Sequence, residues 1–177
     1  MSTAVDPDEL GALAGALGVE GAYWDTAGHH HRAAPDAVAA VLAAMGAPVD
    51  DPSDLGDLRR HVEAESTRLI APVVVWWAED AHAELEVCVP LDGVDDVLAF
   101  HVEVERGGGE ADGRAELARS TEVGHRRAGG VTHSVRRVVL DLPAVPVGYH
   151  RLSVQWRDQR HEATLVVAPR QVAQPAW

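Results

Sequence analysis

The spacing of apolar positions changes near residue 70. Before this point apolar side chains recur every three to four residues, which predicts helices. From Ile70 onward they alternate with polar side chains, which predicts β-strands. The pattern therefore predicts an α+β fold with a helical subdomain over residues 1–69 and an antiparallel β-sandwich over residues 70–169, followed by a linker over residues 170–177.

The first part is expected to hold three helices. Asp6-Pro7-Asp8-Glu9 has the residues of a capped helix start, and Gly18 is a natural stop. Pro35 and the segment Asp51-Pro52-Ser53-Asp54 begin the second and third helices. A short hairpin is expected between the first two helices, because Tyr23-Trp24-Asp25 precedes a Gly turn. The expected inward faces are Val38, Val41, Leu42 and Met45 on the second helix, and Leu55, Leu58, Val62 and Leu69 on the third.

The second part is expected to hold six or seven short strands at regular spacing, which is typical of a sandwich. Residues 106–127 are rich in Gly, Ala and charge, and we predict a long loop or a weak hairpin there. Gly148 and Tyr149 stand where a late strand begins. They are similar to the tyrosine corner of immunoglobulin-like sandwiches, in which the hydroxyl bonds to upstream backbone, so we interpret them as a structural corner.

The charge and the cysteine content of the chain limit the classes of binding partner and the cellular compartments that we expect. The chain has 28 acidic and 15 basic residues, a formal charge of −13, which argues against nucleic acid and against an anionic membrane surface. The single Cys88 excludes an internal disulfide and fits a reducing compartment. No secretory leader is recognised, and no apolar run reaches the roughly 18 residues that cross a bilayer. These features predict a cytoplasmic protein.

A run of three histidines and a set of alternating histidines and glutamates are candidates for a metal site or a catalytic site. The run His29-His30-His31 is extended, so its neighbours point alternately and chelate one ion poorly. The sets His82/Glu84/Glu86 and His101/Glu103/Glu105 could form a polar face over two strands, but ordinary cross-strand pairs on an exposed face give the same pattern. No known catalytic or cofactor motif occurs, so we predict no catalytic residue, no metal and no cofactor.

Trp76 and Trp77 are neighbours on one predicted strand, so one should face the core and the other outward. An exposed Trp on a sandwich can stack on the apolar face of a sugar, which makes this pair the candidate carbohydrate-binding residues. The alternative is a packing role at the seam between the helical part and the sheet, which the usual burial of Trp favours.

The order of features resembles a known family. The segments YWDTAGHHHRAAPDAVAAVLAAMG, LPAVPVGYHRLSV and TLVVAPRQV are similar to the N-terminal region of actinobacterial-type 4-alpha-glucanotransferases, also called amylomaltases. This resemblance covers most of residues 6–170, and Gly-Tyr-His-x-Leu with a downstream Ala-Pro is its most distinctive part.

The resemblance implies a non-catalytic region ahead of a glycoside hydrolase family 77 barrel. Such a barrel transfers glucan units by a retaining mechanism with two carboxylates, and it needs about 250 residues, so its catalytic positions cannot be placed on this chain. The implied partners are the barrel of the same polypeptide and an α-1,4-glucan, with self-association left open. We therefore expect an excised or truncated region that is inert alone and that supports the barrel or positions glucan. The alternatives are a self-standing carbohydrate-binding or adaptor module and, less favoured, an enzyme with an unrecognised His/Glu site on the sandwich.

Overall fold

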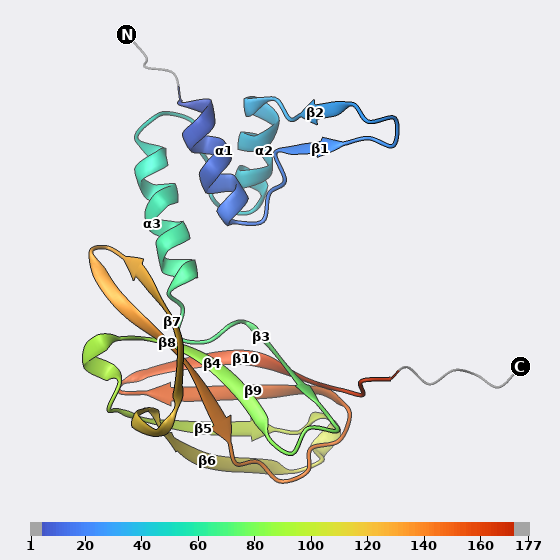
Figure 1. The fold of residues 1–177 in the computed structure, drawn as a ribbon, viewed down its shortest axis with the longest axis vertical. Coiled ribbons are helices and arrows are strands. Elements are labelled where there is room, and N and C mark those ends of the chain that lie inside the picture. Colours follow the sequence, from blue (N-terminus) through green and yellow to red (C-terminus); the bar gives the residue numbers. More distant parts are fainter. Residues whose placement is uncertain (1–4, 172–177) are drawn as a thin grey trace, which may run out of the picture. The chain divides into compact units, whose positions relative to one another are not determined.

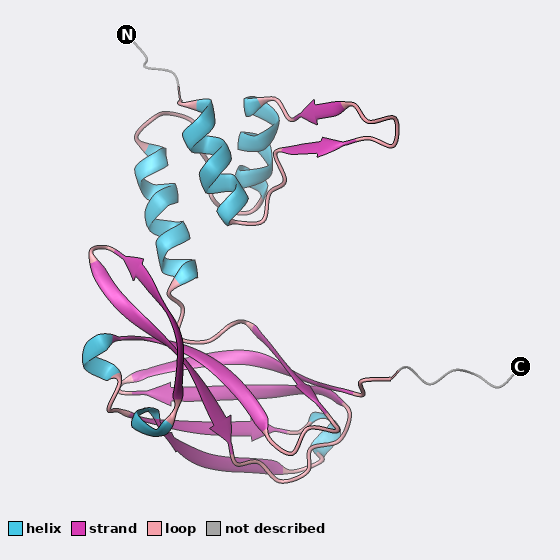
Figure 2. Ribbon diagram, in the orientation of Figure 1, coloured by secondary structure: helices cyan, strands magenta, loops and turns pink. Residues whose placement is uncertain are grey.

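The structure is a computed structural model that describes residues 5–171, and the chain divides into two compact units, Met1–Ser66 and Thr67–Trp177. Helices make up most of the first unit and strands most of the second (Figure 2). The predicted α+β fold, with a helical unit followed by a β-sandwich, is therefore confirmed. Most of the predicted linker, residues 172–177, lies outside the described residues.

The first unit consists of three helices and a hairpin (Figure 1): α1 (Pro7–Ala16), β1 (Ala22–Trp24), β2 (His30–Arg32), α2 (Pro35–Ala44) and α3 (Asp54–Ser66). The predicted start of α1 is present, because the Asp6 carboxylate accepts a hydrogen bond from the backbone N–H of Asp8 at 2.9 Å. None of the helices in the described part of the chain is long and apolar enough to cross a membrane.

The core of the first unit is small and is formed by Leu10, Ala14, Val38, Leu42, Val49, Leu55 and Leu58. The prediction that Val41 and Met45 are buried was wrong, since they are 45% and 52% exposed. α1 packs against α2, and only the narrow stripe of α2 that carries Val38 and Leu42, one turn apart, is buried. Leu69 was also misassigned: α3 ends at Ser66, and Leu69 packs in the core of the second unit.

The second unit is a sandwich of two sheets. The strands are β3 (Val73–Trp77), β4 (Ala83–Pro90), β5 (Val97–Glu103), β6 (Glu110–Glu116), β7 (Thr121–Ala128), β8 (Val131–Leu140), β9 (Gly148–Trp156) and β10 (Gln159–Ala168). One sheet has the order β3-β10-β9-β5-β6 and the other β4-β8-β7. All neighbouring strands pair antiparallel except β3 and β10, which pair in parallel. This pair differs from the predicted antiparallel sandwich, because β3 adds to the edge of the sheet beside β10 and runs in the same direction.

The prediction of a long loop or a weak hairpin over residues 106–127 was wrong, because this segment contributes β6 and β7 to different sheets. The predicted strand count was also wrong, because the described unit has eight strands. The segment looked like a loop because its residues are small or charged. Small residues are what β6 needs: Gly113 lies opposite Phe100 of β5, and a methyl group on it would meet the Phe100 ring at 2.2 Å. β7 lies at the edge of its sheet, where exposed polar side chains are usual.

The predicted alternation along the other strands is confirmed. In β9 and β10 the buried positions include Leu152, Val154, Trp156, Leu165 and Val167, and they fill the core between the two sheets. The outward positions of each strand are then left for polar contacts and for the surface grooves described next.

Candidate carbohydrate-binding groove

The two tryptophans of β3 lie on opposite faces of the strand. Trp76 is only 7% exposed, and its indole N–H donates a hydrogen bond to the Asp80 carbonyl at 3.4 Å. Trp77 is 38% exposed on the outer face. As the alternation predicted, one ring belongs to the core, so only Trp77 is available to contact a ligand.

Trp77 lies in a groove of about 750 Å³ on the outer surface of the sandwich. The groove forms where β3 and β4, each the edge strand of its sheet, come together. Its walls include the outward side chains of three strands: Val75 and Trp77 from β3, Glu84 and Glu86 from β4, and Arg137 and Val139 from β8. The groove thus combines an aromatic ring, aliphatic side chains and charged groups.

Arg137 organises the charged wall. It lies directly opposite Glu86 in the antiparallel pairing of β4 and β8. Its Nη2 is 3.1 Å from Glu86 Oε1, and its Nε is 3.5 Å from Glu84 Oε2. The guanidinium therefore holds two carboxylates side by side, and the three groups together can donate to and accept from ligand hydroxyls.

The Trp77 ring is held from one side by Arg170. The guanidinium carbon of Arg170 lies 5.5 Å from the centre of the ring, within the range of a cation–π contact. Arg170 is itself fixed by Asp80, with Nη2 at 2.6 Å from Oδ1, and by Glu79, which accepts from its backbone N–H at 3.1 Å. These contacts limit the freedom of the indole before any ligand arrives.

The polar face over two strands, which the sequence allowed but did not favour, is not formed. His82, Glu84 and Glu86 belong to β4 or its preceding turn, whereas His101 and Glu103 belong to β5 of the other sheet. His101 instead contacts Asp112 of β6, with Nδ1 at 2.8 Å from Oδ1. Over residues 5–171 no group of three or more His, Cys, Asp or Glu side chains is arranged to hold a metal ion.

The histidine run lies at the hairpin of the first unit, and its members point alternately. His31 and His29 both contact the Asp25 carboxylate, at 2.9 and 3.3 Å, whereas His30 lies against Trp24. The hydrogen bond from His31 is the main cause that lowers the pKa of Asp25, and the backbone N–H of His29 adds to it. The run is thus a loop contact around one carboxylate.

The Gly148-Tyr149 corner is built differently from the predicted one. Tyr149 is 68% exposed, and in the described part of the chain nothing bonds to its hydroxyl. The next residue, His150, is buried: its Nδ1 accepts from the Glu105 backbone N–H at 3.1 Å and its Nε2 lies 2.8 Å from the Pro146 carbonyl. Side chains alternate along β9, so Tyr149 points outward and His150 points inward. The hydrogen bonds that fix the corner are therefore made by the His150 side chain and not by the Tyr149 hydroxyl.

Cys88 has no features of a nucleophile. It is a free, buried thiol in β4, and burial raises its pKa although the nearby charge of Arg126 opposes the shift. A raised pKa keeps the thiol protonated and unreactive, in line with the sequence interpretation.

The sequence interpretation missed Arg137 and Val139, which line the groove beside Trp77, and Arg170, which contacts the Trp77 ring. Arg137 is 51 residues from Glu86 in the sequence. Only the pairing of β4 with β8 brings them together, and no local pattern in either segment indicates that pairing.

The fold belongs to the class of β-sandwich domains preceded by a small helical unit. Residues 69–169 match the family described as the MalQ N-terminal beta sandwich domain. This match covers more than half of the chain, so the protein belongs to that family. A search of curated proteins found no match to the chain.

A solved structure shares the fold over nearly the whole chain. The crystal structure of amylomaltase from Corynebacterium glutamicum is similar with a TM-score of 0.62 and 22% sequence identity. The similarity covers 93% of this chain and 23% of that protein. The chain thus spans about a quarter of the length of the amylomaltase that it resembles.

Proposed function

We propose that this chain is the accessory N-terminal region of a 4-alpha-glucanotransferase, inert alone, and that it positions α-1,4-glucan for a catalytic barrel in the same polypeptide. Membership of the MalQ N-terminal sandwich family and the likeness to an amylomaltase support the assignment to such an enzyme. The observation that carries the glucan role is the exposed ring of Trp77 beside the Glu84–Arg137–Glu86 cluster. The reduced thiol of Cys88 fits a cytoplasmic location, which we also propose.

The chemistry of the groove suits a sugar. An indole face stacks on the C–H groups of a pyranose ring, and Val75 and Val139 extend this apolar surface. Carboxylates and a guanidinium at the rim bond to the hydroxyls that surround the sugar ring. Because Glu84 and Glu86 are already oriented by Arg137, little side-chain freedom is lost when a sugar binds.

Titration calorimetry with maltoheptaose tests the proposal. Trp77→Ala should weaken binding at least about tenfold, which corresponds to roughly 1.4 kcal/mol of lost contact. Tyr149→Ala removes an aromatic ring that is also exposed on the sandwich but lies outside the groove, so it should leave the affinity unchanged. Absence of binding by the wild-type chain would refute the glucan role, and equal affinity of the Trp77→Ala variant would refute the groove at Trp77 as the glucan site.

Inertness is tested separately with maltotriose. The chain should give no disproportionation products at any glucan concentration, because the proposed catalytic carboxylates belong to a barrel. Turnover that persists after repeated purification would contradict this part of the proposal.

A further inference from the structure

The hairpin of the first unit presents two large aromatic rings to solvent. Tyr23 is 61% exposed and Trp24 is 70% exposed. Each strand of the hairpin has three residues, and no buried side chain belongs to either. Cross-strand contacts stabilise such a short hairpin only modestly, and both rings remain largely exposed. Their exposure points to a ligand.

Each ring is backed by a histidine of the opposite strand. Trp24 is paired with His30, their ring centres 4.9 Å apart, and Tyr23 is stacked on His31 at 5.0 Å. The two pairs lie on opposite faces of the hairpin, because neighbouring residues of a strand point in opposite directions. The Trp24–His30 pair therefore forms one preformed aromatic platform on a single face.

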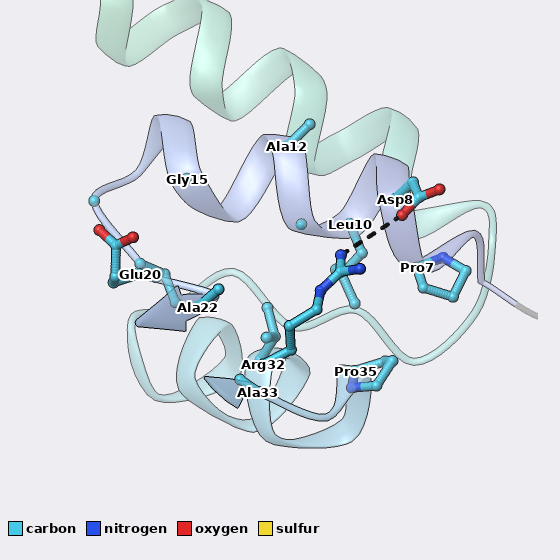
Figure 3. Close-up of a pocket in the computed structure, with 15 residues that line it drawn as sticks. Pro7, Asp8, Leu10, Ala12, Gly15, Glu20, Ala22, Arg32, Ala33 and Pro35 are labelled. Carbon is cyan, nitrogen blue, oxygen red and sulfur yellow. Dashed lines mark ion pairs between the residues drawn. The ribbon is translucent and has the colours of Figure 1, made fainter. Parts of the chain in front are cut away.

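A groove of about 650 Å³ lies beside this hairpin, against α1 and the start of α2 (Figure 3). Ala22 and Arg32, which are paired at the base of the hairpin, form part of its wall. They stand two residues from Trp24 and His30 on their strands, and hence on the same face. The Trp24–His30 platform thus lies on the hairpin face whose base, at Ala22 and Arg32, borders the groove, and the groove lining itself reaches along the strands only to these two residues.

The groove has a flat floor and a charged rim. Gly11 and Gly15 of α1 belong to the lining, and a methyl group added at either would meet no atom within 4 Å. Arg32 reaches across toward Asp8, with Nη2 at 3.9 Å from Oδ1, as Figure 3 shows. Both side chains remain exposed and have donor or acceptor positions left for hydroxyl groups.

We propose that the groove and the Trp24–His30 platform form a second oligosaccharide site, specific for α-1,4-linked glucose units. The choice of this sugar rests on the proposed function, whereas the site itself rests on the geometry of the first unit. A protein partner fits less well, because a stable protein interface needs about 800 Å² on each side and a hairpin with three-residue strands offers much less.

The indole N–H signals of a ¹⁵N-labelled chain, titrated with maltoheptaose, provide the test. The chain has five tryptophans, and single Trp→Phe variants assign their signals. The Trp24 signal should shift and saturate, while the buried Trp156, which lines neither groove, serves as an internal reference. Cellohexaose, which has β-1,4 linkages, should leave the Trp24 signal in place.

Two variants locate the site. Gly15→Leu places a larger side chain in the groove from a Cβ position that has no atom within 4 Å, and it should abolish the saturable shift of Trp24 while the rest of the spectrum stays folded. Tyr23→Ala removes the neighbouring ring on the opposite hairpin face and should leave the shift intact.

The outcomes separate the two sites. An unmoved Trp24 signal with a shifted Trp77 signal overturns the second site and leaves the proposed function standing. A shift of Trp24 alone supports the second site and refutes the sandwich groove. A Trp24 shift that survives Gly15→Leu, or that cellohexaose reproduces, overturns the groove as the binding site for α-1,4-linked units.

Discussion

The imidazole Nδ1 of His150 accepts a hydrogen bond from the backbone N–H of Glu105 at 3.1 Å, although the two residues are 45 positions apart. The other ring nitrogen, Nε2, is 2.8 Å from the Pro146 carbonyl and must carry the proton to donate to it. One neutral, buried side chain thus ties the start of β9 both to the turn after β5 and to the segment before it.

His150→Ala should lower the free energy of unfolding of the sandwich by about 2–4 kcal/mol, because it removes buried volume and leaves a backbone donor and acceptor without partners. Urea unfolding followed by circular dichroism measures the change. The control Tyr149→Ala removes an exposed ring and should change stability by at most about 0.5 kcal/mol. A larger loss for Tyr149→Ala than for His150→Ala would restore the tyrosine as the residue that fixes the corner.

Gly113→Ala should destabilise the sandwich by about 1–3 kcal/mol through overpacking. The new methyl group would meet the ring of Phe100 at 2.2 Å, and that ring is only 3% exposed and enclosed by the core. Gly124→Ala in β7 is the matched control, since no atom lies within 4 Å of its added methyl group. Thermal unfolding of both variants checks the prediction, and equal melting temperatures would show that β6 does not pack on Phe100 as described.

Gly11→Ala should stabilise the first unit by about 1 kcal/mol. The glycine lies inside α1, where alanine is the better helix former, and its added methyl group would meet no other atom within 4 Å. Gly18→Ala should have the opposite sign, because Gly18 ends the same helix with a φ of +84°. Helix content followed by circular dichroism during urea unfolding distinguishes the two. Destabilisation by Gly11→Ala would mean that the helix surface is already covered.

The pKa of Asp25 should lie below the ordinary aspartate value of about 3.9. Because the folded-state pKa is depressed, ionised Asp25 stabilises the hairpin above the unfolded value, and this contribution is lost as the pH falls through the folded pKa. A ¹³C carboxyl titration by NMR measures the midpoint. His31→Ala should raise it, since the hydrogen bond from His31 is the main cause of the shift. His30→Ala, on the opposite face, should leave it unchanged, and a shift equal to that of His31→Ala would contradict the assignment.

The local sequence pattern correctly predicted those structural features that depend only on residues close together in the chain. The cap at Asp6, the hairpin at Tyr23-Trp24-Asp25 and the opposite orientation of Trp76 and Trp77 all follow from spacing over a few residues. The same reasoning failed for residues 106–127. There the deciding feature is the fit of Gly113 against Phe100, which becomes visible only when β5 and β6 are paired.

The residues of the candidate site can also be separated into those predicted from local pattern and those positioned only by the tertiary structure. The sequence by itself determined that Trp76 and Trp77 point to opposite faces and that the carboxylates of β4 lie on its polar face, because alternation is a property of a single strand. Only the tertiary structure decided that Arg137 stands between Glu84 and Glu86, that Arg170 covers the Trp77 ring, and that His150 replaces Tyr149 at the corner. These relationships join residues that are tens of positions apart, and their register is set by strand pairing and core packing across the whole unit.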